Sequence, residues 1–112
     1  MINKYEIWIA DLSPRFGTEP GKIRPVVIVQ TDLLNGKHLS TIVCPMTTRI
    51  IPGATLLRIH LQKGEAGMEH PSDILIDQLR AIDNGRLIRK IGVLNEEKRQ
   101  KINENLSIVL DL

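Results

Sequence analysis

The stretch "PVVIVQ" (residues 25–30) decides the fold, because it is a continuous apolar run rich in β-branched residues. Such a run is typical of a strand that is buried on both of its faces. Pro25 suits the first position of this strand, where its missing N–H does least harm. We therefore expect the most deeply buried strand of the protein here.

Further strands are expected on both sides of this run. The segments that predict them are "YEIWIA" (5–10), "STIVCPM" (40–46), "ATLLRIHL" (54–61) and the start of "DILIDQLRAI" (73–82). The first alternates as a half-buried strand does, and the second should be distorted near Pro45. Alternation in "ATLLRIHL" places Arg58 and His60 on the outward face. Turn-forming residues predict loops at 11–22, 32–37 and 62–72.

The last part of the chain changes period. Apolar residues recur at helical spacing at Ile102, Leu106, Val109 and Leu110, and Asn95 can cap this helix. A short helical turn is expected within 83–90. Five or six short strands before a terminal helix predict a mainly β fold of the α+β kind, with a strongly bent sheet or partial barrel.

Length and composition fit one domain spanning residues 1–112. The chain has 112 residues, 42% of them hydrophobic, and a net charge of +2, which permits an anionic partner without requiring one. The single cysteine, Cys44, cannot form an internal disulfide and should be a small buried apolar residue. The N-terminus does not resemble a signal peptide, and no apolar run approaches the roughly 20 residues of a membrane span, so we expect a soluble cytoplasmic protein with no membrane partner.

The loop before the buried strand is the first candidate site. Arg24 should be held rigidly next to that strand, with Arg15 and Lys22 close by, and Gly17 and Gly21 allow unusual backbone conformations. Guanidinium groups match phosphate oxygens well, so the loop could bind an anion. A solvated hinge loop with an exposed arginine explains the same residues equally well.

Two further segments carry polar groups where strands end. In "MTTRI" (46–50) these are Thr47, Thr48 and Arg49, although threonine is ordinary at the end of a strand. In "DQLRAID" (77–83) they are Asp77, Gln78 and Arg80, which are either paired structurally or directed into a cleft. The three histidines lack metal-ligand spacing, so we expect neither a metal site nor a cofactor.

Together these segments resemble the MazF/PemK/Kid family of toxin endoribonucleases. The similarity covers nearly the whole chain and includes "EIWIADLSPRFGTEPGKIRPVVIVQ", a strand ending in Thr47, "ILIDQLRAID" and "LNEEKRQKINENLSIVL". It implies an SH3-like β-barrel with a C-terminal helix, assembled as a homodimer. It also implies metal-independent, sequence-specific cleavage of single-stranded RNA, leaving 2′,3′-cyclic phosphate or 3′-phosphate and 5′-OH ends and inhibiting translation and growth.

The resemblance further implies a cognate antitoxin, MazE-like, whose acidic disordered tail lies in the RNA groove. Contact with DNA would arise indirectly, through the toxin–antitoxin complex. By position, Arg24 corresponds to the catalytic arginine of the family and Thr47 to its catalytic threonine, while Asp77 falls where relatives carry an acid. Some members have a histidine where this chain has Thr18, and an arginine where it has Leu75, so their histidine-based mechanism is not expected here.

In the mechanism that these residues suggest, Arg24 stabilises the phosphorane and Thr47 donates a hydrogen bond to the phosphate or relays a proton. Asp77 could be the base or could orient Arg24, with Glu19 as a less favoured base. RNA contacts are expected from Arg15, Thr18, Glu19, Lys22, Thr48, Arg49, Gln78 and Arg80, and base readout from the loops at 11–22, 48–54 and 62–72. A gyrase poison or a non-catalytic nucleic-acid-binding module of the same fold is the alternative.

Overall fold

The computed structural model describes residues 1–14, 16–18 and 22–112. Seven strands and one α-helix occur in this part of the chain, joined in places by short 3₁₀ turns. The elements are β1 (Glu6–Asp11), β2 (Ile23–Ile28), β3 (Ser40–Thr47), β4 (Arg58–Leu61), η1 (Glu65–Gly67), β5 (Ser72–Leu75), η2 (Ile76–Gln78), β6 (Arg80–Asp83), η3 (Asn84–Arg86), β7 (Leu87–Val93) and α1 (Glu96–Leu110).

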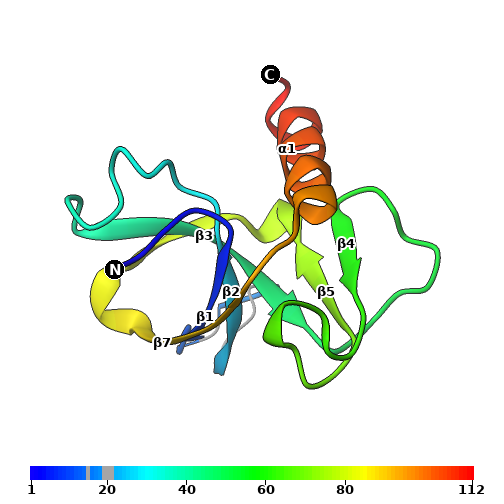
Figure 1. Cartoon of the computed structure of the whole chain (residues 1–112), viewed down its shortest axis with the longest axis horizontal. Helices are drawn as coiled ribbons and strands as arrows, with labels where there is room; N and C mark the ends of the chain where they lie inside the picture. The colour runs from blue at the N-terminus through cyan, green and yellow to red at the C-terminus, as the bar shows by residue number, and fades with distance from the viewer. Residues whose placement is uncertain (15, 19–21) are drawn as a thin grey trace.

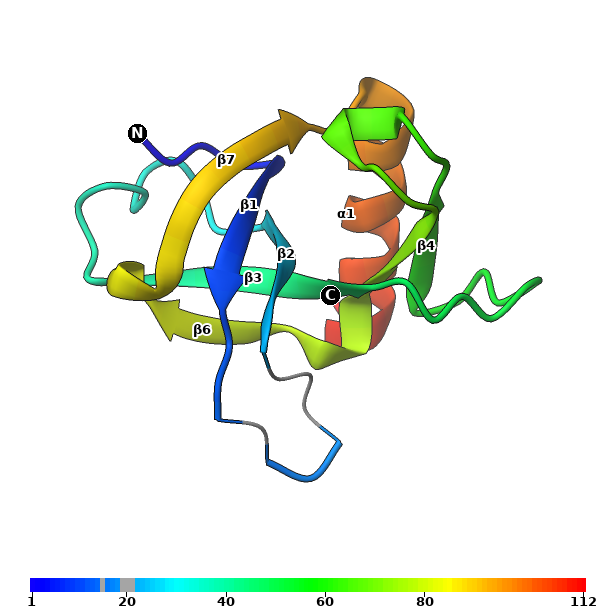
Figure 2. The same ribbon diagram turned by 90° about the horizontal axis from the view of Figure 1, so that it is seen from below.

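The strands pair in the order β4-β5-β3-β2-β1-β7, and β6 also pairs with β3. All of these pairings are antiparallel. Strand β7 curves around β1 (Figure 2), and its register against β1 shifts between Ile7 and Trp8 and again between Ile9 and Ala10. Such irregularities bend a sheet. The sheet therefore has the strong curvature of a partial barrel, as predicted, with β4 and β7 as the two ends of its strand order.

Apolar side chains pack against both faces of the central strand β2. Val27 lies in a cluster that contains Ile102 of α1, whereas Val26 and Ile28 lie in a second cluster with Leu12. All five of these residues are fully buried. Burial on both faces is what the run of β-branched residues predicts, and this expectation is confirmed.

The terminal helix α1 lies beside β4 and β5 in Figure 1, away from β1 and β7. Asn95 caps it as predicted, because its side chain accepts a hydrogen bond from the backbone N–H of Lys98 at 3.0 Å. No helix among the described residues is long and apolar enough to cross a membrane.

Two predicted strand boundaries were wrong. Strand β2 begins at Ile23, so Pro25 lies inside it, opposite Ile9 of β1. Strand β4 begins only at Arg58, because Leu57 has a left-handed backbone (φ 67°) and donates its N–H to the side chain of Asn105 at 3.0 Å. A helix residue therefore satisfies the backbone group that a longer strand would have paired.

The short helical turn expected within residues 83–90 is present, but it ends at Arg86. A single 3₁₀ turn, η3, is present, and the carboxylate of Asp83 caps it by accepting the N–H of Gly85 at 2.8 Å. From Leu87 onward the chain is a strand, because β1 supplies backbone partners along its length. The strand count thus exceeds the five or six expected.

Candidate active site

A cleft opens where β2 and β3 separate. The two strands are paired from Ile28 opposite Val43 as far as Val26 opposite Pro45, and the pairing ends there. On its other edge, β3 continues with β5, where Thr47 lies opposite Asp73. Proline has no N–H to offer a neighbouring strand. The pairing with β2 therefore ends at Pro45, at the mouth of the cleft, while β3 itself continues to Thr47.

Arg24 and Thr47 lie on the two sides of this separation. The Nη1 atom of Arg24 donates a hydrogen bond to the backbone carbonyl of Met46 at 3.2 Å, which brings the guanidinium beside the residue that precedes Thr47. The hydroxyl oxygen of Thr47 accepts the backbone N–H of Arg49 at 3.1 Å. Since Arg24 also pairs in register with Ala10 of β1, its backbone is held by the sheet while its side chain reaches across the gap.

The cleft has a volume of about 730 Å³ and is walled by β1, β2, β3, β7 and the segment between β4 and β5. Its described lining residues are Ile9, Ile23, Arg24, Pro25, Met46, Thr47, Thr48, Arg49, Gly67, Met68, Glu69, His70, Ser72, Arg89, Lys90 and Ile91. Four of these are Lys or Arg and one is acidic, so this lining favours an anionic ligand.

The structure brings four of the predicted site residues together at the cleft: Arg24, Thr47, Thr48 and Arg49. It places the other described ones elsewhere. Thr18 and Lys22 are exposed, Asp77 is exposed on η2, and Gln78 and Arg80 are half-buried on the η2–β6 side of β3. None of these five is among the lining residues. The predicted contacts at Arg15 and Glu19, like the backbone role of Gly21, lie outside the described residues.

Strand β7 supplies basic groups that sequence reasoning missed. Arg89 and Lys90 line the cleft, and Lys90 also forms an ion pair of 2.8 Å with the buried carboxylate of Glu6. Burial alone would raise the pKa of Glu6, but hydrogen bonds from Lys90, Trp8 and Asn3 outweigh it and lower the pKa from 4.5 to about 2. Reading 83–90 as a helical turn hid this wall of the cleft.

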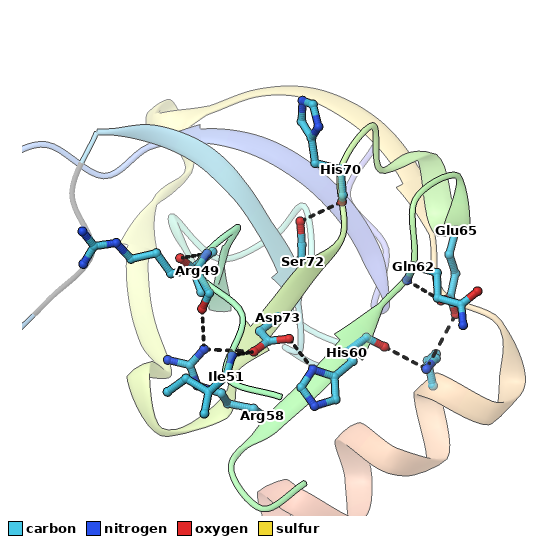
Figure 3. Close-up of polar contacts among 11 residues, drawn as sticks. Arg49, Ile51, Arg58, His60, Gln62, Glu65, His70, Ser72 and Asp73 are labelled. Atoms are coloured by element: carbon cyan, nitrogen blue, oxygen red, sulfur yellow. Dashed lines mark hydrogen bonds and ion pairs between the residues drawn. The ribbon is translucent and has the colours of Figure 1, made fainter. Parts of the chain in front are cut away.

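A buried carboxylate next to the cleft was also missed. Asp73 is fully buried and accepts hydrogen bonds from Arg58, His60 and the backbone N–H of Ile51, as Figure 3 shows. Arg58 and His60, which were expected on the outward face of their strand, both contact it. An acidic residue flanked by Ser72 and Ile74 in a buried strand is the one signal that could have revealed it.

The cysteine of β3 does not take part in the cleft. Cys44 is fully buried, and burial, with a smaller contribution from the charge of Asp77, raises the pKa of its thiol from 9.0 to about 12. The thiol is therefore protonated at neutral pH and unsuited to nucleophilic attack. Its interpretation as a small buried apolar residue is confirmed.

Comparison with known proteins shows similarity along the whole chain. The family model of PemK-like, MazF-like toxins of type II toxin–antitoxin systems matches residues 3–110. The chain is 35% identical over 112 residues to the endoribonuclease MazF of Staphylococcus saprophyticus, which covers 100% of this chain and 93% of that protein.

Solved structures share the fold. MazF from Deinococcus radiodurans superposes with a TM-score of 0.84 at 20% identity, covering 99% of this chain and 97% of that one. The Mycobacterium tuberculosis toxin MazF-mt6 gives a TM-score of 0.77 at 26% identity, covering 96% of this chain and 97% of that one. The expected fold, a curved antiparallel sheet with a C-terminal helix, is therefore confirmed.

Proposed function

The chain belongs to the PemK-like, MazF-like toxins of type II toxin–antitoxin systems. On that premise we propose that it is an endoribonuclease, and that it cleaves single-stranded RNA bound in the cleft between the side chains of Arg24 and Thr47. The observation that carries this proposal is the separation of β2 from β3, which places a guanidinium and a hydroxyl on either side of one basic cleft. The full-length similarity to an endoribonuclease supports the same activity.

The reaction that fits these groups uses the 2′-OH of the RNA as its nucleophile. The 2′-OH gives up its proton to a base as the bond from the 2′-oxygen to phosphorus forms. The bond from phosphorus to the 5′-oxygen breaks and the leaving oxygen gains a proton, so no net proton is consumed. The products are a 2′,3′-cyclic phosphate, which hydrolysis can open to a 3′-phosphate, and a 5′-OH. Arg24 stabilises the charge that develops on the phosphorane oxygens, since a fixed guanidinium donates to two oxygens at once.

Thr47 is the second group of the proposed site. Its oxygen already accepts the N–H of Arg49, so its own proton is available for a phosphate oxygen or for relay to the leaving group. Asp77, which the resemblance suggests as a base or as a partner of Arg24, does not line the cleft in the single chain. The proposal therefore rests on Arg24 and Thr47.

An antitoxin is the expected protein partner, because the family consists of the toxins of two-component systems. The basic cleft suits an acidic antitoxin tail as well as RNA, so we infer that the two compete for it. We also propose a homodimer that acts in the cytoplasm, with DNA contacts made through the antitoxin complex.

The test is to incubate the purified protein with a long unstructured RNA in EDTA, beside Arg24→Ala and Thr47→Val variants, and to map the new ends. We expect discrete cuts with 5′-OH ends from the wild type and a loss of at least about 100-fold in Arg24→Ala. Folding of each variant is checked by circular dichroism. Intact RNA from a folded, antitoxin-free wild type would refute the proposal and favour a gyrase-poisoning or purely binding role.

A further inference from the structure

The fully buried carboxylate of Asp73 lies one strand away from Thr47. The two residues are paired in register across β5 and β3. Oδ2 of Asp73 accepts a hydrogen bond from Nη1 of Arg58 at 2.9 Å and another from the backbone N–H of Ile51 at 3.3 Å. Oδ1 faces Nδ1 of His60 on the other side.

Arg58 links this carboxylate to the chain that follows Thr47. The same Nη1 atom that contacts Asp73 also donates to the backbone carbonyl of Arg49 at 2.8 Å. In Figure 3 the guanidinium of Arg58 lies between the Asp73 carboxylate and this backbone segment. Two backbone groups, the carbonyl of Arg49 and the N–H of Ile51, are therefore held by one ion pair between the buried Asp73 and the partly exposed Arg58.

This series of contacts, from Asp73 through Arg58 to the backbone of Arg49, continues to the proposed catalytic hydroxyl of Thr47. The N–H of Arg49 donates to Oγ1 of Thr47 at 3.1 Å. This contact occupies part of the acceptor capacity of the oxygen and leaves the hydroxyl proton to be donated elsewhere. The N–H and the carbonyl of Arg49 belong to the two peptide groups on either side of its Cα, so a displacement of the Arg49 backbone would weaken the hydrogen bond that orients the Thr47 hydroxyl.

We propose that Asp73 is a positioning residue for Thr47, acting through Arg58 and the backbone of Arg49. This inference rests on the proposed function, in which the Thr47 hydroxyl contacts the scissile phosphate. The ion pair of Asp73 with Arg58 orients the hydroxyl before RNA binds, which is the preorganisation that transition-state stabilisation requires. His60 contacts the opposite carboxylate oxygen and lies off this path, which makes it a matched control.

The kinetic test compares Asp73→Asn, Arg58→Met and His60→Phe on one short RNA substrate, below the melting temperature of each variant. Arg58→Met retains the aliphatic stem but removes both hydrogen bonds, whereas His60→Phe removes a partner of Asp73 without touching Arg49. We expect kcat to fall roughly 10- to 100-fold in the first two variants, with KM within about threefold. In His60→Phe, kcat and KM should both stay within about threefold of the wild-type values. Equal losses of kcat in Arg58→Met and His60→Phe would overturn the proposal.

A measurement without RNA separates this proposal from the proposed function. Backbone order parameters from ¹⁵N relaxation should fall below about 0.6 at residues 49–51 in Asp73→Asn and Arg58→Met, and stay unchanged in His60→Phe. Order parameters that do not change in any variant would overturn the positioning path even if the enzyme is active. If the wild type does not cleave RNA, the proposed function fails and this measurement still decides whether the path exists. If Thr47→Val cleaves as fast as the wild type, the role of Thr47 fails, and the inference with it.

Discussion

The Cα of Gly67 lies against the backbone carbonyl of Ile91 so closely that a Cβ on Gly67 would be 2.1 Å from that oxygen. Likewise, a Cβ on Gly92 would be 1.9 Å from the carbonyl oxygen of Ala66. The segment between β4 and β5 therefore packs backbone to backbone on β7. This contact holds Met68 and its neighbours in the wall of the cleft.

We predict that Gly67→Ala lowers the free energy of unfolding by about 3 kcal/mol, because two backbone segments must separate to admit the methyl group. Gly53→Ala is the matched control. Gly53 has a similar left-handed φ of 79° against 81° at Gly67, but no atom lies within 4 Å of its Cβ position. The control should lose only about 1 kcal/mol, the cost of the backbone conformation. Urea titration measures the unfolding free energy of both variants. Equal losses of stability in Gly67→Ala and Gly53→Ala would contradict the close packing of Gly67 on β7.

We predict that the contribution of Glu6 to stability depends on pH. The pKa of Glu6 in the folded protein, about 2, is lower than its ordinary 4.5. Its ionised form therefore stabilises the fold above about pH 4.5, and this contribution is lost as the pH falls toward 2. Because Lys90 is half exposed to solvent, we expect roughly 2 kcal/mol rather than the full value of the pKa shift.

The measurement is the difference in unfolding free energy between the wild type and Glu6→Gln at several pH values. It should shrink from about 2 kcal/mol near pH 6 to near zero near pH 2. Glu97→Gln serves as the control, since Glu97 forms an exposed pair of 3.5 Å with Lys101 and its loss should cost less than about 0.5 kcal/mol. A difference for Glu6→Gln that stays constant with pH would refute the prediction.

Cys44 should be unreactive in the folded protein. With its pKa raised to about 12 and its side chain fully buried, the thiol is neither ionised nor accessible at pH 8. We expect no reaction with a disulfide reagent until urea unfolds the chain, when one thiol per molecule reacts. Rapid labelling of the native protein would show that β3 opens more readily than its burial indicates. Cys44→Ala should retain RNA cleavage.

Arg89 should contribute to RNA binding through its charge. Replacing it with glutamine should reduce the slope of log affinity against log salt concentration by about 0.7, the value for one phosphate contact on a single strand. An RNA methylated at its 2′-oxygens allows binding to be measured without cleavage. Lys37→Gln is the control, because Lys37 is exposed in the turn after β2 and does not line the cleft. Identical slopes for the two variants would remove Arg89 from the RNA site.

Local patterns predicted the elements with strong periodicity or composition. The β-branched run at 25–30 and the capped helix after Asn95 were found because each is specified by its own residues. Leu57 and the segment 87–93 were misread because distant residues decide them. Asn105 of α1 accepts the backbone N–H of Leu57, so β4 starts only after that residue. Strand β1 pairs with residues 87–93 and so makes them the strand β7.

The site follows the same division. The placement of Arg24 and Thr47 at the cleft could be predicted because each lies near the end of a recognisable strand and matches a family motif. Asp73 and Arg58 could not, since their relation to Arg49 depends on the pairing of β4 with β5 and on a side chain that bridges two loops. Arg89 was not predicted as a site residue because β7, the strand that carries it, was not predicted.

The pairing of β7 with β1 also bears on how the protein is made. The ribosome releases β1, Arg24 and Thr47 well before Arg89, Lys90 and Ile91, yet these late residues wall the same cleft. Pairings between the ends of a chain form late, since a long loop must close first. A nascent chain thus lacks one side of the cleft until its last quarter has been made and β7 has paired with β1.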